Sequence, residues 1–259
     1  MKPDEAEVTM TALKKISIVI PALNEEKGIG PVLRAIPIDE LKKMNYAVEL
    51  LVIDNGSTDQ TPHIARKHGA TVIIQPVRGY GNAYKAGFAN ATGDIIATGD
   101  ADLTYPFDIL PSVIKKMEAE DLDFVTTDRL ATLQPEAMSR FHVFGNWVLT
   151  RMTRLLFRWP FNDSQSGMWI FKRRIWAQLD VRSSGMPFSQ ELKIEAHAKG
   201  FKCAEIPINY QARAGQEKLN VRDGPGNISH LLKKRLTLRK NLFETTPALS
   251  ETERHAEIM

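Results

Sequence analysis

Residues 93–103, Gly93-Asp94-Ile95-Ile96-Ala97-Thr98-Gly99-Asp100-Ala101-Asp102-Leu103, form a short apolar run that ends in two carboxylates. Side chains two residues apart on an extended backbone point to the same side, so Asp100 and Asp102 are placed to share one hard cation. Such a cation would neutralise a bound diphosphate. A solvated pair in a strand-to-helix turn is the alternative for so short a motif, and the surrounding sequence favours the cation site.

Short β-branched apolar runs alternate with helical segments on both sides of this stretch. Such alternation is typical of βαβ units and of a parallel sheet that is buried on both faces. We therefore predict an α/β protein with a single Rossmann-like, mostly parallel sheet flanked by helices. The expected strands are 16–20, 48–53, 71–75, 94–98, 122–127 and 201–208, and the expected helices are 61–68, 81–91 and 108–119.

Polar clusters follow the predicted strands at the edge where such sheets bind ligands. Glu25, Asp54, Arg78 and Asp100 should converge there. A carboxylate such as Asp54 is costly at the end of a buried strand unless it has a partner, which a nucleobase N–H or a ribose hydroxyl would supply. Arg78 offers a charged fork to a phosphate or a base carbonyl. The glycines after Arg78 lack the spacing of a dinucleotide fingerprint, which argues against a nicotinamide dehydrogenase.

Composition excludes several other classes of protein. The chain has 259 residues, with 34 basic and 31 acidic side chains and a net charge of +3, so it has no strong field for nucleic acid. Cys203 is the only cysteine, which excludes an internal disulfide and any site built from several cysteines. No apolar run reaches the roughly 18 residues of a transmembrane helix. We expect a polar tail over 1–14, one domain over 15–228, and a basic helix and tail over 229–259.

Four ordered motifs resemble family 2 glycosyltransferases of the GT-A fold. Within that family the chain looks most like the dolichyl-phosphate mannose synthase and polyprenyl-phosphate sugar synthase branch, because of Asp163-Ser164-Gln165-Ser166-Gly167 and the late Arg213 and Lys218. The motifs are Ile18-Val19-Ile20-Pro21-Ala22-Leu23-Asn24-Glu25, Val52-Ile53-Asp54-Asn55-Gly56-Ser57-Thr58-Asp59, Arg78-Gly79-Tyr80-Gly81 and Asp100-Ala101-Asp102-Leu103.

The resemblance implies a role for each matching residue. Asp100 and Asp102 would hold Mg²⁺ or Mn²⁺ on the donor diphosphate, and Arg213 and Lys218 would lie on a loop, 211–224, that closes over the donor. The acceptor phosphate would meet Arg129, Arg140, Ser166 and Gly167. The donor nucleotide would be surrounded by Pro21, Ala22, Asn24, Glu25, Asp54, Arg78, Gly79 and Asp100.

Two positions depart from the family pattern. Thr104 stands where many dolichyl-phosphate mannose synthases have Gln, which leaves the third metal ligand open. Asn55 replaces the second acid of the usual Asp-Asp-Gly-Ser run, which leaves the base of the nucleotide open.

An amphipathic region follows in the second half of the chain. Apolar positions 144, 147, 148, 152, 155 and 156 approximate a helical stripe flanked by Arg140, Arg151, Arg154 and Arg158. The stripe fits either a core-packed helix or an interfacial helix on a bilayer. The basic stretch 233–240 is either a solvated helix end or a second contact with anionic lipid. We predict a cytoplasmic protein held peripherally on the cytoplasmic face of a membrane, with a membrane protein as a possible further partner.

The predicted reaction is transfer of a hexose from a UDP- or GDP-sugar to a polyprenyl phosphate, with inversion at the anomeric carbon. The alternatives are a soluble family 2 enzyme that acts on a hydroxyl of a glycerate or glycan with Glu191 as base, and a non-catalytic subunit that binds nucleotide sugars. A hydroxyl acceptor needs a base, whereas a lipid phosphate is already ionised. The expected catalytic residues are Asp100, Asp102, Arg129, Glu191, Arg213 and Lys218.

Overall fold

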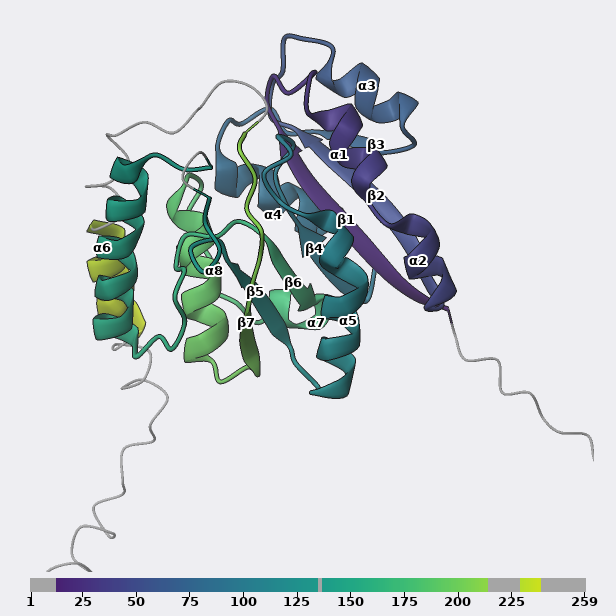
Figure 1. Cartoon of the computed structure of the whole chain (residues 1–259). Helices are drawn as coiled ribbons and strands as arrows, with labels where there is room; N and C mark the ends of the chain where they lie inside the picture. Colours follow the sequence, from purple (N-terminus) through teal and green to yellow (C-terminus); the bar gives the residue numbers. More distant parts are fainter. Residues whose placement is uncertain (1–12, 135–136, 214–228, 239–259) are drawn as a thin grey trace, which may run out of the picture.

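The computed structural model describes residues 13–134, 137–213 and 229–238 (Figure 1). One seven-stranded sheet has the order β3-β2-β1-β4-β6-β5-β7. Its strands are parallel except for β6, which pairs antiparallel with both β4 and β5. The predicted mostly parallel sheet is therefore confirmed. The strands are β1 (Lys14–Ala22), β2 (Tyr46–Asp54), β3 (Thr71–Ile74), β4 (Ile95–Thr98), β5 (Phe124–Asp128), β6 (Trp169–Lys172) and β7 (Cys203–Pro207).

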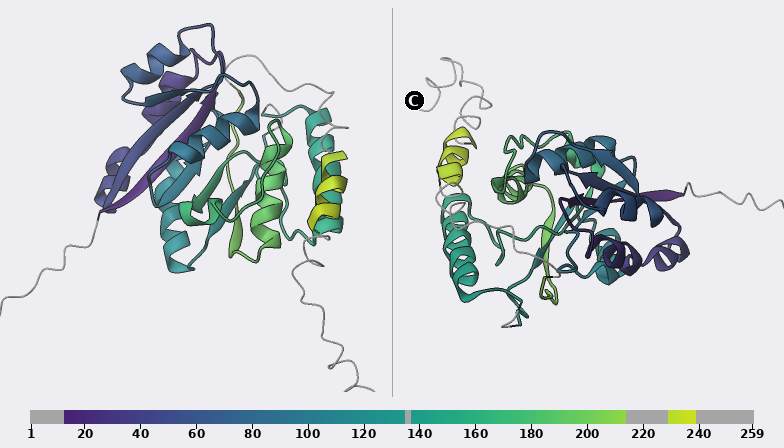
Figure 2. Two further views of the ribbon diagram at one scale, coloured as in Figure 1. Left: turned by 180° about the vertical axis from the view of Figure 1, so that it is seen from behind. Right: turned by 90° about the horizontal axis from the view of Figure 1, so that it is seen from above.

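Helices cover both faces of the sheet (Figures 1 and 2). Proline in the first turn of α3, α5 and α8 suits a position whose N–H has no partner within the helix. The helices are α1 (Ile29–Ala35), α2 (Ile38–Lys43), α3 (Thr61–Lys67), α4 (Tyr80–Asn90), η1 (Phe107–Ile109), α5 (Leu110–Ala119), α6 (Arg140–Phe157), α7 (Arg173–Trp176) and α8 (Pro187–Ala198), and a further helix spans 229–238.

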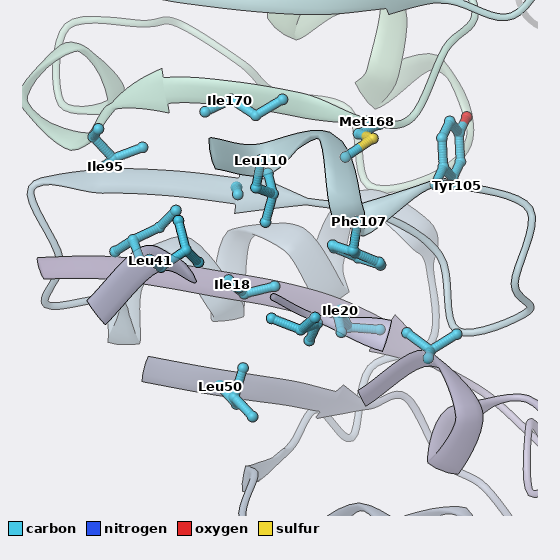
Figure 3. Close-up of a cluster of buried hydrophobic side chains, with 14 of the residues drawn as sticks. Ile18, Ile20, Leu41, Leu50, Ile95, Tyr105, Phe107, Leu110, Met168 and Ile170 are labelled. Carbon is cyan, nitrogen blue, oxygen red and sulfur yellow. The ribbon is translucent and has the colours of Figure 1, made fainter. Parts of the chain in front are cut away.

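The central strand β1 is buried on both faces, as a parallel sheet between helices requires. Ile16, Ile18 and Ile20 pack into a core with α1, α2 and α5, part of which is drawn in Figure 3. The alternate residue Val19 faces a second core with α4 and α8. β1 pairs with β2 on one side and β4 on the other, so the ends of these strands form one edge.

A third layer lies beyond α8, where α6 and helix 229–238 run beside each other (Figures 1 and 2). Leu149 and Phe157 of α6, Ile194 of α8 and Leu231 of the last helix form a small separate core. The opposite side of α6 exposes large apolar side chains: Phe141, Phe144, Trp147 and Leu155. The predicted stripe is thus divided between a packed face and an exposed face.

No helix within the described ranges has the length and apolar character needed to cross a bilayer. β1 begins at Lys14, while most of the predicted N-terminal tail (1–12) and residues 239–259 of the C-terminal segment lie outside the described residues. Of the predicted closing loop 211–224, residues 214–224, including Lys218, lie outside them as well.

Candidate functional site

The end of β2 carries the first buried carboxylate of the site. Asp54 is paired in register with Ala22 at the end of β1 and is 4% exposed. One of its carboxylate oxygens accepts the backbone N–H of Ser57 at 3.0 Å, which caps the turn after the strand. Asp54, Ala22 and the preceding Pro21 therefore lie together at the carboxyl ends of β1 and β2, the edge at which a donor nucleotide is expected.

Asn24 and Glu25 join the loop after β1 to the loop after β2. The Asn24 side chain accepts the Thr58 N–H at 2.8 Å, and its backbone N–H donates to the Ser57 hydroxyl. Asn24 has φ 52°, a left-handed conformation that Asn tolerates better than most residues. Glu25 donates its backbone N–H to the Thr61 hydroxyl at 2.7 Å, so its backbone is held beside the loop that follows Asp54.

Asn55 acts as a clamp on the loop that follows β3. Its side-chain amide donates to the carbonyls of Gln75 and Val77, both at 3.0 Å, and its oxygen accepts the Gly79 N–H at 2.7 Å. A carboxylate at this position would have no N–H for the two carbonyls. This geometry gives a structural reason for the departure from the family pattern, and it places Arg78, which donates to the Gly56 carbonyl, next to the β2 turn.

An acidic cluster lies where β4 ends. The Asp102 carboxylate accepts the backbone N–H and the hydroxyl of Thr104, at 3.1 and 2.6 Å. Arg213 bridges this cluster, with one guanidinium nitrogen 3.2 Å from Asp102 and the other 2.5 Å from Glu25. Residues far apart in the chain are therefore joined at one point, and Thr104 orients Asp102.

Asp100 differs from its neighbour, because no donor among the described residues hydrogen-bonds its carboxylate. Burial, together with the charge of Asp102, raises the pKa of Asp100 to about 7. Two adjacent carboxylates of this kind repel each other, and a proton or a bound cation relieves the repulsion.

The residues of this cluster fit a divalent ion that also binds a ligand phosphate. No group of three or more His, Cys, Asp or Glu side chains in the described part of the chain is arranged to hold a metal alone. Mg²⁺ characteristically takes one or two carboxylates and completes its shell with phosphate oxygens and water. Asp100 and Asp102 supply that number of carboxylates, which is the pairing predicted from their spacing.

Two glycines bring neighbouring segments against the acidic pair. A Cβ on Gly28, before α1, would lie 2.2 Å from the Ala101 carbonyl. A Cβ on Gly167 would lie 2.6 Å from the Tyr80 hydroxyl and 3.8 Å from Asp100. The segment 163–167, predicted to meet the acceptor, therefore runs directly beside Asp100, and only glycine permits the approach.

Arg129 is held by Asp163. The guanidinium and the carboxylate form a bidentate pair at 2.7 and 3.0 Å, and the Arg129 backbone N–H also donates to Asp163. The Tyr210 ring lies against the guanidinium. Burial would raise the pKa of Asp163, but the Arg129 charge holds that pKa below its usual value. Arg129 is thus a fixed buried cation near Asp100, whose pKa it lowers.

A buried lysine supports the same segment. Lys193 of α8 donates to the Ser166 and Asp163 carbonyls at 2.9 and 3.3 Å, and Trp169 and Ser189 donate to the Ser166 carbonyl as well. Burial lowers the pKa of Lys193 to about 7. A neutral amine still carries N–H donors for both carbonyls. Ser166 itself is buried and shares a hydrogen bond with Thr127.

Two predicted residues lie elsewhere. Glu191 is 1% exposed and contacts Lys234 and the backbone of 182–183 rather than the acidic cluster. Arg140 is exposed at the start of α6, whereas Arg129 is buried beside Asp163.

The structure also adds residues that the sequence did not single out: Lys193, Tyr105, whose hydroxyl accepts the Gly167 N–H, and Tyr210. A lysine and two tyrosines in loops carry no local signal. Their roles arise from tertiary contacts.

The sequence matches the family model "Glycosyl transferase family 2" over residues 17–179. It is 38% identical over 220 residues to the low-salt glycan biosynthesis hexosyltransferase Agl6 of Haloferax volcanii, covering 84% of this chain but only 53% of that relative. It is 34% identical over 206 residues to a dolichyl-phosphate hexose transferase of the same organism, covering 79% of this chain and 86% of the relative.

The fold is similar to that of glucosyl-3-phosphoglycerate synthase from Mycobacterium tuberculosis, solved in complex with Mn²⁺, uridine diphosphate and phosphoglyceric acid. The TM-score is 0.69 at 24% identity, covering 86% of this chain and 78% of that one. This likeness confirms the predicted GT-A fold. Since the family model spans most of the sheet and its site, the chain belongs to glycosyl transferase family 2.

Proposed function

We propose that this protein is an inverting transferase that moves a hexose from a UDP- or GDP-sugar to a polyprenyl phosphate at a membrane surface. The observation that carries the proposal is the junction of Glu25, Asp102 and Arg213 beside Asp100, because it combines metal-binding carboxylates with a cation for a diphosphate. The dolichyl-phosphate hexose transferase of Haloferax volcanii, similar over 86% of its length, supports the choice of acceptor.

The donor side needs a place for a nucleoside and a place for its diphosphate. Asp54, Asn24 and the Arg78 loop offer the first, since they meet at the ends of β1 and β2. Asp100 and Asp102 would hold Mg²⁺ or Mn²⁺, which supplies charge neutralisation for the departing diphosphate. Arg213 would move from these carboxylates to the phosphate oxygens when the donor binds, because its planar fork suits both.

The acceptor side favours an anionic nucleophile. A phosphate needs no base, and Glu191, the residue predicted as base for a hydroxyl acceptor, is buried and already accepts hydrogen bonds from the backbone and from Lys234. Burial acts to raise its pKa, but the hydrogen bonds from Ser183 and the charge of Lys234 keep the pKa of Glu191 below its usual value, which weakens it as a base. Arg129, fixed beside Asp100, supplies a positive field for the acceptor phosphate.

The exposed face of α6 suits a lipid substrate. Phe144 is 62% exposed, Trp147 54% and Leu155 83%, and Arg151 lies over the Trp147 ring. Aromatic and apolar side chains with arginines beside them are typical of helices that lie in the interface of an anionic bilayer. We infer that this face rests on the membrane from which the lipid phosphate enters.

The test is an assay of nucleoside diphosphate release and of butanol-extractable product. UDP- and GDP-hexoses are supplied with Mn²⁺, with and without a polyprenyl phosphate in detergent. We expect turnover only with the lipid and a loss of about 100-fold or more in Asp102→Asn, because the charge that stabilises the leaving group is lost. Asp108→Asn, an exposed acid in η1, is the control. Turnover with a soluble hydroxyl acceptor and none with lipid would contradict the proposal.

A further inference from the structure

Glu191 takes part in a buried charge cluster that reaches the last described helix. Lys234 is 5% exposed and lies 3.1 Å from Glu191 and 2.6 Å from Glu195 of α8. It also donates to the Asp180 carbonyl at 2.6 Å. Lys234, which belongs to helix 229–238, is therefore the nearest cation to both buried carboxylates. Removing one partner of such a cluster leaves an uncompensated buried charge, which is strongly unfavourable.

The other oxygen of the Glu191 carboxylate holds a loop. It accepts the backbone N–H groups of Arg182 and Ser183 at 3.1 and 2.8 Å. His230 of helix 229–238 lies 3.2 Å from the Ser183 hydroxyl, so the helix contacts this loop directly as well. Glu191 thus joins the helix to the loop through the two oxygens of a single carboxylate.

That loop packs on the glycine-rich turn of the proposed donor site. The Ser184 carbonyl accepts the Asn82 N–H at 3.1 Å. A Cβ on Gly79 would lie 2.4 Å from the Ser184 carbonyl oxygen, and one on Gly81 would lie 2.5 Å from that of Ser183. The two segments are in backbone contact, so a displacement of 182–184 must displace the turn.

Turn 78–82 also makes contacts within the proposed donor site. The Asn82 side chain donates to the Arg78 carbonyl at 3.1 Å, and the Gly79 N–H donates to Asn55 at the end of β2. We propose that Glu191 is a positioning residue that couples the docking of helix 229–238 to the geometry of the donor turn 78–82.

The identity of the ligand rests on the proposed function, but the coupling does not. The first readout is therefore hydrogen exchange of the free protein over 79–82. We expect Lys234→Met and Glu191→Gln to speed exchange at the Asn82 amide by about tenfold, a typical coupling between linked sites. Lys234→Arg keeps the positive charge, so exchange at the Asn82 amide should be as slow as in the wild type. Lys199→Met is the matched control, because Lys199 pairs with Glu195 from the exposed side at 3.9 Å.

The second readout separates positioning from base catalysis. In Glu191→Gln and Lys234→Met we expect the KM for the donor to rise about tenfold with kcat changed less, since the donor turn is displaced and the reacting groups are not. Unchanged exchange at 79–82 in both variants would overturn the coupling. A fall in kcat confined to Glu191→Gln, with the donor KM unchanged and the acidic limb of the pH profile lost, would overturn it in favour of a general base. Failure of wild-type turnover with lipid would instead count against the proposed function.

Discussion

The Arg213 guanidinium lies 3.2 Å from the Asp102 carboxylate, in the place where a divalent cation and a diphosphate would be expected. The same side chain contacts Glu25, so a single positive charge already compensates part of the negative charge of the site before any ligand binds. Arg213 and a metal therefore compete for Asp102.

This competition predicts opposite effects of one substitution. Arg213→Met should bind Mn²⁺ several-fold more tightly in the absence of nucleotide, since a partly exposed ion pair that competes with the metal contributes about 1 kcal/mol. It should bind nucleoside diphosphate more weakly. Titration of Mn²⁺ followed by electron paramagnetic resonance measures the first effect and calorimetry the second. Arg66→Met, an exposed arginine on α3, is the control. A weaker affinity for both ligands would exclude the competition.

The Arg129–Asp163 pair predicts a large loss of stability. Asp163→Asn removes a fully buried carboxylate and leaves Arg129 charged and unpaired, which should lower the free energy of unfolding by about 3–5 kcal/mol. Urea denaturation measures this. Glu120→Gln, which breaks the exposed pair with Lys116, should change it by less than about 1 kcal/mol. Similar effects of the two substitutions would show that the Arg129 pair is not held as described.

Lys193 predicts a pH dependence of stability with a definite sign. Its folded pKa of about 7 lies below the usual 10.5, so between these values the unfolded chain binds a proton that the folded protein does not. The stability of the wild type relative to Lys193→Met should therefore rise by up to about 1.4 kcal/mol per pH unit above pH 7, and the dependence should vanish below it. Thermal or urea unfolding from pH 6 to 9 tests this, with the exposed Lys115→Met as control. Parallel curves for wild type and Lys193→Met would refute it.

The contacts of Asn55 predict that the acid usual in the family would be harmful at position 55 of this chain. Asn55→Asp would place a carboxylate against the Gln75 and Val77 carbonyls, which should cost about 1–3 kcal/mol for the groups left unsatisfied and should weaken nucleotide binding. Melting temperature and calorimetry report the two effects. Asn90→Asp changes an exposed amide that donates to the Ala86 carbonyl within α4 and serves as the comparison. Equal nucleotide affinity in both variants would contradict the clamp.

The exposed face of α6 predicts binding to lipid vesicles. Phe144→Ser with Trp147→Ser should lower the fraction of protein that sediments with anionic vesicles by about tenfold or more, because each substitution loses about 1.5–3 kcal/mol of apolar transfer free energy. Leu13→Ser with Ile74→Ser removes comparably exposed apolar residues elsewhere and should have little effect. Loss of binding in both double variants, or in neither, would exclude α6 as the contact.

Local patterns predict the first half of the fold well. The segments 61–68, 71–75 and 81–91 lie within a residue of α3, β3 and α4, because each combines a clear hydrophobic pattern with a turn at its end. β6 is absent from the predicted strands. Its four residues form a short apolar run, and hydrophobic periodicity alone cannot assign such a run to a strand or a helix. Its antiparallel direction depends on pairing with β4, more than 70 residues earlier.

The candidate site divides in the same way. The positions of Asp54, Asp100 and Asp102 could be predicted, because the end of a strand is visible in the local sequence pattern. The buried contacts of Arg129 with Asp163, and of Glu191 with Lys234, join residues that are 34 and 43 positions apart. At each of these positions the sequence shows only a charged residue. A charged residue is expected at the surface unless its distant partner is known.

The insertion of β6 between β4 and β5 has a consequence for synthesis of the chain. When residues up to 128 have left the ribosome, the edge of β4 that β6 will cover is still open. β6 follows β4 by about 70 residues in the chain. Exposed strand edges pair readily with other chains. The strand that leads to Asp100 and Asp102 is thus the last of the first half to be closed, and truncation before Lys172 should yield aggregating fragments rather than a smaller working enzyme.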